Sequence, residues 1–294
     1  MDFHTLLAFK AVAETGSFSR AAEQLCLTQP AISKRVAQLE SELDSRLFDR
    51  IGHRISLTES GRALLPRVRR ILLEVEDCKR TISNLAGHVA GPLSIGTSHH
   101  IGLHRLPPVL RNFSTTYPDV ELDLHFMDSE LACRAVQHGD LELGIVTLPL
   151  RPLPELKSRL VWPDPLAFII NADHPLADLQ DVSPAKLCEY PAILPTPGTY
   201  TREVIEQAFA PLGLQIPIRM GTNYLETIKM MVSVGLGWGV LPRSMLDREL
   251  LSLNVHEMTL ARQLGVVWHG ARSLSSAAKA MLDMLPEDQV TTNS

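Results

Sequence analysis

Amide, hydroxyl and ammonium groups gather at the start of a helix predicted from residue 28 onwards. The segment TQPAISKRVAQLESEL, residues 28–43, has its apolar residues at positions 32, 36, 39 and 43, on one face of a helix. The other face leads with Gln29, Ser33 and Lys34. Such groups donate hydrogen bonds to base edges and phosphates when a helix lies in the major groove of DNA. The segment therefore predicts a DNA-reading helix; the alternative is a helix start whose polar face is only solvated.

Two earlier helical patterns must position this helix. An apolar stretch over residues 6–13 ends at Gly16, a favourable helix stop, and a second helix is predicted over residues 18–25. A three-residue turn separates the second pattern from the third. Thr28 can cap the third helix, and Pro30 falls in its first turn, where a missing N–H costs little. This arrangement predicts a helix-turn-helix, which any three-helix packing can also imitate.

A basic hairpin and a charge imbalance strengthen the DNA interpretation. Residues 47–57, LFDRIGHRISL, predict a short hairpin, or wing, and residues 46–70 contain seven arginines against two acidic residues. The whole chain has a net charge of −5, but residues 1–88 carry 13 Lys and Arg against 11 Asp and Glu, which leaves 15 against 22 for residues 89–294. A basic head on an acidic body indicates that the head binds nucleic acid and the body does something else.

A long amphipathic helix is predicted after Thr58. Its apolar positions alternate at spacings of four and three over three heptads, the pattern of a coiled-coil seam. Pro66 is expected to bend this helix or weaken its first turns, and Gly87 and Gly91 end it. The seam residues, which we expect to pair two copies of the chain, are Leu64, Val68, Ile71, Val75, Cys78, Ile82 and Leu85.

From residue 92 onwards strands alternate with helices, which predicts a parallel sheet. The first such unit has strands expected at 92–98, 120–128 and 141–147, with a helix at 104–113 that is broken by Pro107 and Pro108 and a helix at 131–137. A proline-rich stretch, 148–165, then precedes a second α/β unit with a strand at 166–170 and helices at 204–209 and 225–234. A strand at 263–268 and a helix after Ser275 return to the first unit. Two lobes joined by crossing strands create a ligand-sized cleft.

Ser98, His99 and His100 follow the first of these strands, at a predicted helix N-terminus. The N–H groups and the dipole of a helix N-terminus favour an anion. The alternative is that these residues only cap the helix and close a turn. His100 and His104 are four residues apart and can share a helical face as metal ligands, but no third ligand is evident in the sequence, so no metal site is expected.

Motifs of enzymes are missing from the sequence. Neither GxSxG nor HExxH occurs, and the GLGWG segment, residues 235–239, lacks both the third glycine of a dinucleotide fingerprint and a Walker lysine. The four cysteines are far apart without CxxC pairing, which predicts reduced thiols and neither a disulfide framework nor a zinc site. No membrane span or secretory signal is readable, so a cytoplasmic, nucleoid-associated protein without cofactors is expected.

Residues 3–61 resemble the N-terminal domain of LysR-type transcriptional regulators. The phrases GSFSRAAEQL, TQPAISKRVAQLE, LFDR and LTESG stand in order and at the family's spacing. The resemblance extends more weakly over the rest of the chain through YPDVELDL, GDLELGIV and VSVGLGWGVLP. It implies a winged helix-turn-helix, a linker helix, and a two-lobed α/β domain like type II periplasmic binding proteins. It also implies a homodimer or homotetramer that binds interrupted palindromes near promoters and responds to a small molecule.

The resemblance also implies which residues touch the two ligands. Those implied to contact DNA, in the recognition helix and the wing, are Thr28, Gln29, Pro30, Ser33, Lys34, Arg35, Arg50 and Arg54. Those implied to lie near the effector, besides Ser98, His99 and His100, are Thr147, Thr199, Tyr200, Thr201, Arg202 and Asn223. Hydroxyls, imidazoles and an arginine suit a small carboxylate or other oxyanion. The paired histidines depart from the family's more common Ser/Thr pattern, so the effector cannot be inferred from relatives.

The predicted organisation is therefore a DNA-binding domain over residues 1–58, a dimerisation helix over 59–88 and an effector-binding domain over 89–294. In the last, lobe I comprises about 92–162 and 266–294, and lobe II about 163–265. The expected partners are promoter DNA, a small effector, a second copy of the chain and RNA polymerase, and no membrane or catalysis is expected. The alternatives are a DNA-binding head fused to a catalytic or solute-binding body, and an architectural DNA-binding protein without an effector.

Overall fold

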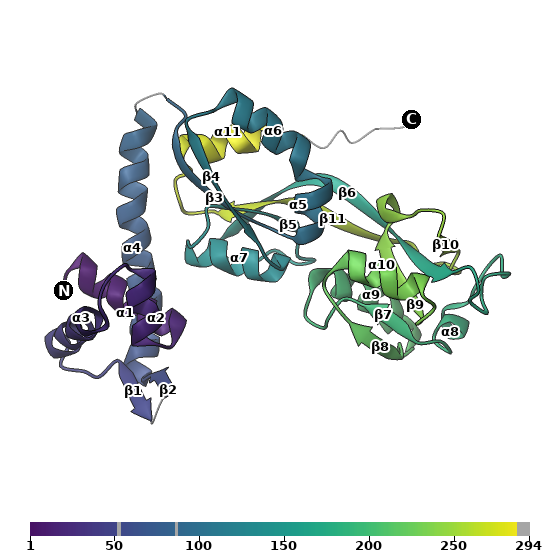
Figure 1. Ribbon diagram of the computed structural model, residues 1–294, viewed down its shortest axis with the longest axis horizontal. Helices are drawn as coiled ribbons and strands as arrows, with labels where there is room; N and C mark the ends of the chain where they lie inside the picture. Colours follow the sequence, from purple (N-terminus) through teal and green to yellow (C-terminus); the bar gives the residue numbers. More distant parts are fainter. Residues whose placement is uncertain (52–53, 86–87, 287–294) are drawn as a thin grey trace. The chain divides into compact units, whose positions relative to one another are not determined.

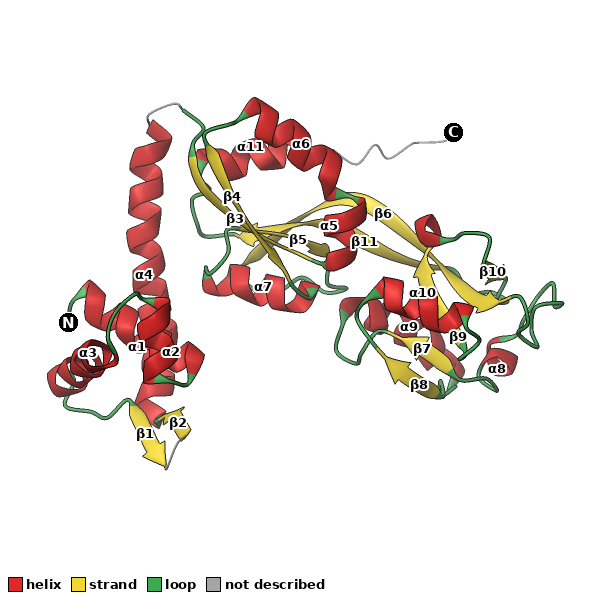
Figure 2. Ribbon diagram, viewed as in Figure 1, coloured by secondary structure: helices red, strands yellow, loops and turns green. Residues whose placement is uncertain are grey.

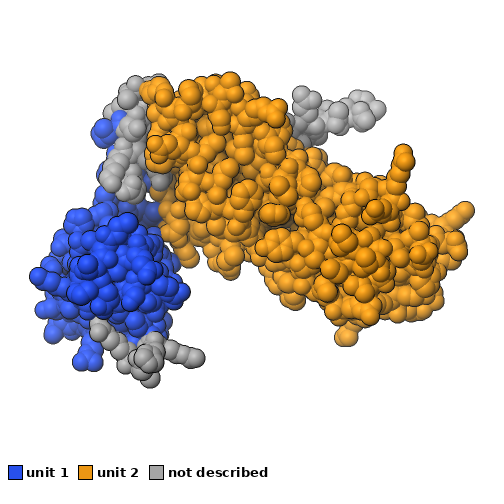
Figure 3. All heavy atoms as spheres, viewed as in Figure 1, with its two compact units in different colours: residues 1–86 blue, residues 87–294 orange. Residues whose placement is uncertain are grey.

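The chain folds into two compact units, residues 1–86 and 87–294, called unit 1 and unit 2 (Figure 3). The structure, a computed structural model, describes residues 1–51, 54–85 and 88–286. It confirms the predicted fold class, a winged helix-turn-helix with a long helix and then a two-lobed α/β body.

Unit 1 consists of three short helices, a hairpin and one long helix (Figure 1). Its elements are α1 (Phe3–Thr15), α2 (Phe18–Gln24), α3 (Gln29–Glu42), β1 (Phe48–Ile51), β2 (Arg54–Leu57) and α4 (Glu59–Leu85). Local chemistry sets the helix ends. The side chains of Asp2, Ser17 and Thr28 each accept a hydrogen bond from an N–H in the first turn of the helix they precede, and Gly16 ends α1 in the left-handed conformation at φ 63°.

One apolar core holds unit 1 together. The inward faces of α1, α2 and α3 meet in it, and α4 contributes Val68 and Leu72 from its third and fourth turns. Residues in this core that are wholly buried are Ala8, Phe9, Val12, Ala21, Ile32, Val36, Leu39 and Val68. The start of α4 is therefore part of the DNA-binding fold and not a free linker. The helix continues through Pro66.

Unit 2 is built on one nine-stranded sheet in the order β4-β3-β5-β11-β6-β9-β7-β8, with β10 also beside β6. The strands are β3 (Gly91–Thr97), β4 (Val120–Phe126), β5 (Leu143–Thr147), β6 (Leu156–Asn171), β7 (Ala192–Leu194), β8 (Ile218–Gly221), β9 (Trp238–Pro242), β10 (Leu250–Leu253) and β11 (Leu260–His269). Pairing is parallel for β3 with β4 and β5, and for β7 with β8 and β9, but antiparallel wherever β6 or β11 takes part. The predicted parallel sheet is therefore confirmed only inside each lobe.

Helices cover both faces of the sheet in each lobe, and Figure 2 shows this for lobe I. In lobe I, α6 (Leu106–Thr116) and α11 (Ser276–Met284) share a core with β3, β5 and β11, and α7 (Ser129–His138) packs on the other face. In lobe II, α9 (Tyr200–Phe209) and α10 (Leu225–Ser233) pack against alternate residues of β6, β7 and β9, in two separate cores. The lobe II helix α8 (Pro184–Leu187) adds Leu187 to the α9 core.

Two predictions about element boundaries are wrong. The proline-rich stretch before residue 166 is not a connection, because β6 begins at Leu156 and runs through Pro163 and Pro165. There β6 pairs only with β11 on one side, and its pairing with β9 begins at Leu166, so neither proline interrupts a second ladder. The helix predicted over 104–113 with a break at Pro107 and Pro108 is the continuous helix α6, because both prolines fit its first turn, and a separate helix, α5 (His99–His104), precedes it.

Candidate functional site

The leading face of α3 is open to solvent in unit 1. Thr28, Gln29, Pro30 and Lys34 are exposed, whereas Ser33 and Arg35 are half-buried. The opposite face of α3 lies in the unit 1 core. Amide, hydroxyl and ammonium groups thus stand on the outward side of the second helix of a helix-turn-helix, the position from which such helices read a major groove.

The wing is tied directly to α3. The Glu40 carboxylate of α3 accepts hydrogen bonds from the backbone N–H groups of Leu47 at 2.7 Å and Phe48 at 3.3 Å. Phe48 in turn packs its ring against Phe9 and Phe18, with centroids 5.4 and 5.9 Å apart. The hairpin and the helix therefore share one buried anchor and keep a fixed spacing.

The two wing arginines lie on the paired strands of the hairpin. Arg50 pairs with Ile55, and Arg54 with Ile51, in the β1–β2 ladder. The side chains of Arg50 and Arg54 lie outside the described part of the structure, so their contact with DNA remains a prediction from the resemblance.

The α4 seam divides into two parts. Leu64 packs against the unit 1 core and Val68 is wholly buried in it, so neither is available to a partner helix. Further along, Ile71 is 41% exposed and Ile82 69% exposed. Of the remaining seam positions, Val75 is half-buried, Cys78 is exposed, and the side chain of Leu85 lies outside the described residues. Ile71 begins the stretch of seam that a second chain can cover.

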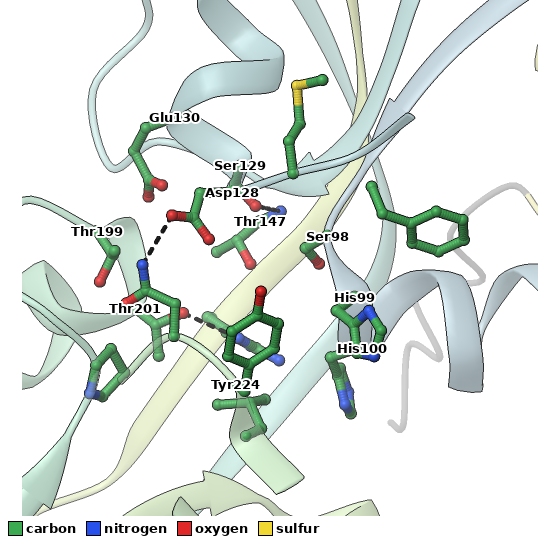
Figure 4. Close-up of a pocket in the computed structure, with 16 residues that line it drawn as sticks. Ser98, His99, His100, Asp128, Ser129, Glu130, Thr147, Thr199, Thr201 and Tyr224 are labelled. Carbon is green, nitrogen blue, oxygen red and sulfur yellow. Dashed lines mark hydrogen bonds between the residues drawn. The ribbon is translucent and has the colours of Figure 1, made fainter. Parts of the chain in front are cut away.

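A pocket of about 120 Å³ lies within unit 2, where residues from both lobes meet (Figure 4). It brings together seven of the nine residues predicted for the effector site: Ser98, His99, His100, Thr147, Thr199, Thr201 and Asn223. Ser98, His99 and His100 stand on one side, at the start of α5, and Thr199 and Thr201 stand opposite, at the start of α9. The pocket is also lined by Phe126, Met127, Asp128, Ser129, Glu130, Pro195, Tyr224, Leu225 and Arg262.

A buried guanidinium forms the cationic end of the pocket. Arg262 on β11 donates from Nε to Asp164 Oδ2 at 2.7 Å and from Nη1 to Thr201 Oγ1 at 2.9 Å. Asp164 also accepts from Arg105 Nη2 at 3.2 Å. Asp164 is 1% exposed and Arg262 is 6% exposed, and Nη2 of Arg262 is buried without a hydrogen-bond partner among the described residues. An acceptor in the pocket would satisfy that nitrogen.

His100 stands next to this guanidinium and is held neutral. Burial, and secondly the charge of Arg262, lower the pKa of the His100 imidazole to about 4. At neutral pH His100 therefore contributes a hydrogen-bond donor and a lone pair to the pocket, but no positive charge.

Carboxylates line the other end of the pocket. Asp128 Oδ2 accepts from Asn223 Nδ2 at 2.8 Å, and Asn223 Oδ1 accepts from the N–H of Thr196 at 3.0 Å. Glu130 accepts from the backbone N–H of Tyr200, and burial raises the pKa of its carboxyl above the usual range. The pocket thus presents donors beside Arg262 and acceptors beside Asp128.

Two residues predicted for the effector site point elsewhere. Arg202 does not line the pocket: its Nε donates to Glu206 Oε1 at 2.7 Å, one turn along α9. Tyr200 packs its ring into the core beneath α7. The arginine at the pocket is Arg262, which the sequence analysis missed. No local signal in the sequence identifies Arg262, because its place at the pocket depends on the pairing of β11 with β5 and β6.

Comparisons with known proteins identify the family. Residues 3–62 match the family model described as "Bacterial regulatory helix-turn-helix protein, lysR family", and residues 86–289 match "LysR substrate binding domain". The chain belongs to the LysR family of bacterial transcriptional regulators. The predicted resemblance is thereby confirmed over nearly the whole chain, and so is the prediction that the protein is not an enzyme, since LysR proteins are regulators.

Individual LysR proteins are similar along their full length. A "RuBisCO operon transcriptional regulator" from Acidithiobacillus ferrooxidans is 33% identical over 287 residues, covering 96% of this chain and 92% of the relative. A full-length OxyR variant from Pseudomonas aeruginosa has the same fold, with a TM-score of 0.73 at 22% identity over 97% of this chain and 94% of that one. The effector-binding domain of QuiR in complex with shikimate, 19% identical, superimposes with a TM-score of 0.61 over 67% of this chain and 95% of that domain.

None of the helices in the described part of this LysR chain has the length and hydropathy to cross a bilayer.

Proposed function

We propose that this LysR regulator binds interrupted palindromes near promoters as a homodimer or homotetramer, and that a small carboxylate bound between its lobes modulates that binding. Family membership establishes the coarser statement: the chain is a DNA-binding transcriptional regulator with an effector-binding domain.

The outward face of α3 supports a direct role in reading bases. Gln29 and Ser33 carry groups that hydrogen-bond to base edges, the Pro30 ring suits a thymine methyl, and Lys34 suits a phosphate. A site with two-fold symmetry requires two such faces at a fixed spacing. The exposed seam of α4 supports pairing of two chains, since Ile71 and Ile82 are large apolar side chains left in water in the single chain.

The unpartnered Nη2 of Arg262 is the observation that carries the effector proposal. A buried N–H group without a partner is costly, and a carboxylate accepts from guanidinium more strongly than a neutral group does. The hydroxyl of Ser98 makes no capping hydrogen bond and is free to donate as well. At the other end, Asp128 and Glu130 accept donors, so the ligand that fits best is a carboxylate that also carries hydroxyl or amino groups. Shikimate, named with the similar QuiR domain, has this chemistry.

A ligand changes how the oligomer binds DNA only if it binds one arrangement of the oligomer more tightly than another. Because the pocket is lined from both lobes, a bound carboxylate stabilises the arrangement in which those two linings are close together. We propose that this changes the spacing of the DNA-binding pairs in the oligomer, and with it the bending of DNA and contact with RNA polymerase. Bending has a sequence-dependent cost, so bases that the protein never touches also contribute to specificity.

Thermal unfolding of the full chain with matched ligands tests the effector proposal. Shikimate and malate are compared with their neutral amides. Each compound is tested on the parent protein and on Arg262→Lys, which keeps the positive charge but loses the two parallel N–H donors of the guanidinium group. A ligand at a hundred times its dissociation constant stabilises by about 2.7 kcal/mol, which gives a clear rise in Tm. We expect at least one carboxylate to raise the Tm of the parent, and Arg262→Lys to reduce that rise.

The control for this experiment is Arg202→Lys, whose side chain lies outside the pocket and pairs with Glu206. It should leave the ligand effect unchanged. Equal shifts for the acids and their amides, or equal shifts for all three proteins, would contradict a carboxylate held by Arg262.

A further inference from the structure

Two imidazoles and one carboxylate meet where α5 of lobe I faces α10 of lobe II. His100 and His104 are four residues apart on α5, and their ring centroids lie 4.8 Å from each other. His104 Nε2 lies 3.1 Å from Glu226 Oε1, although the two residues are 122 positions apart in the sequence. One donor atom from each of the three residues can be chosen so that all three lie within 4.8 Å of one another.

Polar side-chain atoms in this cluster lack hydrogen-bond partners among the described residues. His100 is 4% exposed, and both of its ring nitrogens are buried without a hydrogen bond to any described residue. Oε2 of Glu226 is buried and unpaired in the same way. Buried polar atoms in native proteins nearly always have a partner, and a bound ion is one of the few things that can supply it. The Nη2 of Arg262, which is also unpaired, is a donor and therefore calls for a different ligand.

We propose that His100, His104 and Glu226 bind one divalent transition-metal ion of the zinc class. Two imidazole nitrogens and one carboxylate oxygen form a set that zinc uses in proteins, with a fourth position left for water or another ligand. Imidazole selects zinc, nickel and copper, whereas magnesium and calcium prefer oxygen ligands throughout. The charges nearby permit a cation, since Glu226 is an anion and the neighbouring Arg262 is paired with Asp164.

The distances fit with small side-chain rotations. Zinc lies about 2.0–2.2 Å from nitrogen and oxygen ligands, so two ligands of one ion are roughly 3–3.5 Å apart. The 3.1 Å separation of His104 and Glu226 is already in that range, and the His100 ring must turn toward them. The side chains of His104 and Glu226 are 46% and 40% exposed, so an ion reaches the cluster from solvent without unfolding.

Such an ion would connect the two lobes. Ile101 of α5 belongs to the core of lobe I, and Leu225 and Ile228 of α10 belong to a core of lobe II. Because His100 also lines the pocket, the metal would sit at one side of the effector site and favour the arrangement with the lobes together. The inference does not depend on the carboxylate proposed above, since neither His104 nor Glu226 lines that pocket.

Calorimetric titration of the full chain, after EDTA treatment and dialysis, tests the metal site. Zinc chloride is titrated into the parent protein, His104→Ala and Glu226→Gln, and magnesium chloride serves as the hard-cation comparison. We expect one zinc per chain in the parent and little heat from magnesium. Both variants should bind zinc at least about tenfold more weakly, because losing even a residue that only supports a ligand costs about 10- to 100-fold.

A matched control uses another histidine that pairs with a carboxylate. His125 Nε2 lies 2.8 Å from Asp123 Oδ2 on β4, and His125→Ala removes an exposed imidazole while leaving the three-residue cluster intact. It should bind zinc as the parent does. Replacing zinc with cobalt gives a second measurement, because the visible absorption of a tetrahedral cobalt site should appear in the parent and in His125→Ala and be lost in Glu226→Gln.

Three results would overturn the inference. These are zinc affinity that is the same in the parent and both site variants, zinc binding that follows the exposed thiols Cys26 and Cys78, and no zinc binding by folded parent protein. Folding of each protein is verified by circular dichroism. If His104→Ala proves unstable, Glu226→Gln still tests the site, because glutamine has nearly the same shape as glutamate. Shikimate and malate titrated without zinc report on the pocket separately, so failure of the metal site and failure of the carboxylate proposal give different results.

Discussion

Replacing Asp164 with asparagine should destabilise unit 2 strongly, because Asp164 is the acceptor for two guanidinium groups in a buried position. Its carboxylate lies 2.7 Å from Arg262 Nε and 3.2 Å from Arg105 Nη2 and is 1% exposed. Asparagine keeps one acceptor oxygen, presents an N–H₂ group to the other arginine, and leaves the Arg262 charge uncompensated. Removing one partner of a buried ion pair costs about 3–5 kcal/mol of unfolding free energy.

Urea unfolding followed by tryptophan fluorescence measures this effect in the full chain. All three tryptophans of the chain, Trp162, Trp238 and Trp268, belong to unit 2, so the signal reports that unit and not the DNA-binding unit. The control is Arg105→Gln, which removes the more exposed partner, at 29% side-chain exposure. Its loss should cost no more than about 1 kcal/mol, the range of exposed ion pairs.

A double replacement separates stability from ligand binding. Exchanging Asp164 and Arg262 together for leucine and methionine should recover most of the lost stability, since apolar residues of similar volume often replace a buried ion pair without cost. The same protein should no longer respond to shikimate or malate. A loss below about 1 kcal/mol for Asp164→Asn, equal to that of Arg105→Gln, would refute the buried charge network as the support of the pocket.

Three further predictions concern the DNA-reading helix, the dimer seam and a thiol. Lys34→Ala should weaken DNA binding and reduce the slope of log affinity against log salt by about one, measured by fluorescence anisotropy. Ile71→Asp with Val75→Asp should halve the mass found by sedimentation, because a carboxylate on the seam cannot be desolvated by a partner helix. Burial raises the pKa of the Cys133 thiol to about 11, so about one thousandth is thiolate at pH 8, and iodoacetamide should modify exposed Cys26 while sparing Cys133 in the folded chain.

Each of these measurements has a matched control. Lys279→Ala removes an exposed lysine from α11 in unit 2 and should leave DNA affinity and its salt slope unchanged. Leu212→Asp places a carboxylate at an apolar side chain that is 50% exposed in lobe II and should leave the sedimented mass unchanged. An unaltered salt slope in Lys34→Ala, an unaltered mass in the seam variant, or rapid modification of Cys133 would each contradict the corresponding assignment.

Features that depend on residues close together in the chain were predictable. The helix-turn-helix and the wing follow from capping residues, a tight turn and apolar spacing, all within the first 60 residues or so, and the structure reproduces their order. The seam of α4 was predicted as one continuous stripe, yet its first part packs into the unit's own core through Val68. Periodicity shows which face of a helix is apolar but not which surface covers that face.

Features that depend on the pairing of distant segments were not predictable. Arg262 reaches the pocket only because β11 crosses from lobe II into lobe I beside β6. Glu226 approaches His104 only because two helices of different lobes face each other across 122 residues of sequence. The family resemblance implied Arg202 at the effector site, and the order of residues in the sequence alone brings neither Arg262 to the pocket nor Glu226 to His104.

The DNA-reading role of α3 is tested most directly by sequencing fragments of the encoding organism's genome that the purified full chain captures. Capture is done in parallel with the Lys34→Ala variant and with a cell metabolite extract present or absent. We expect an enriched interrupted palindrome near promoters, with enrichment weakened by Lys34→Ala and occupancy altered by the extract. If the folded protein enriches no sequence under either condition, or if the variant enriches the same fragments equally well, the assignment of α3 as the DNA-reading helix is contradicted.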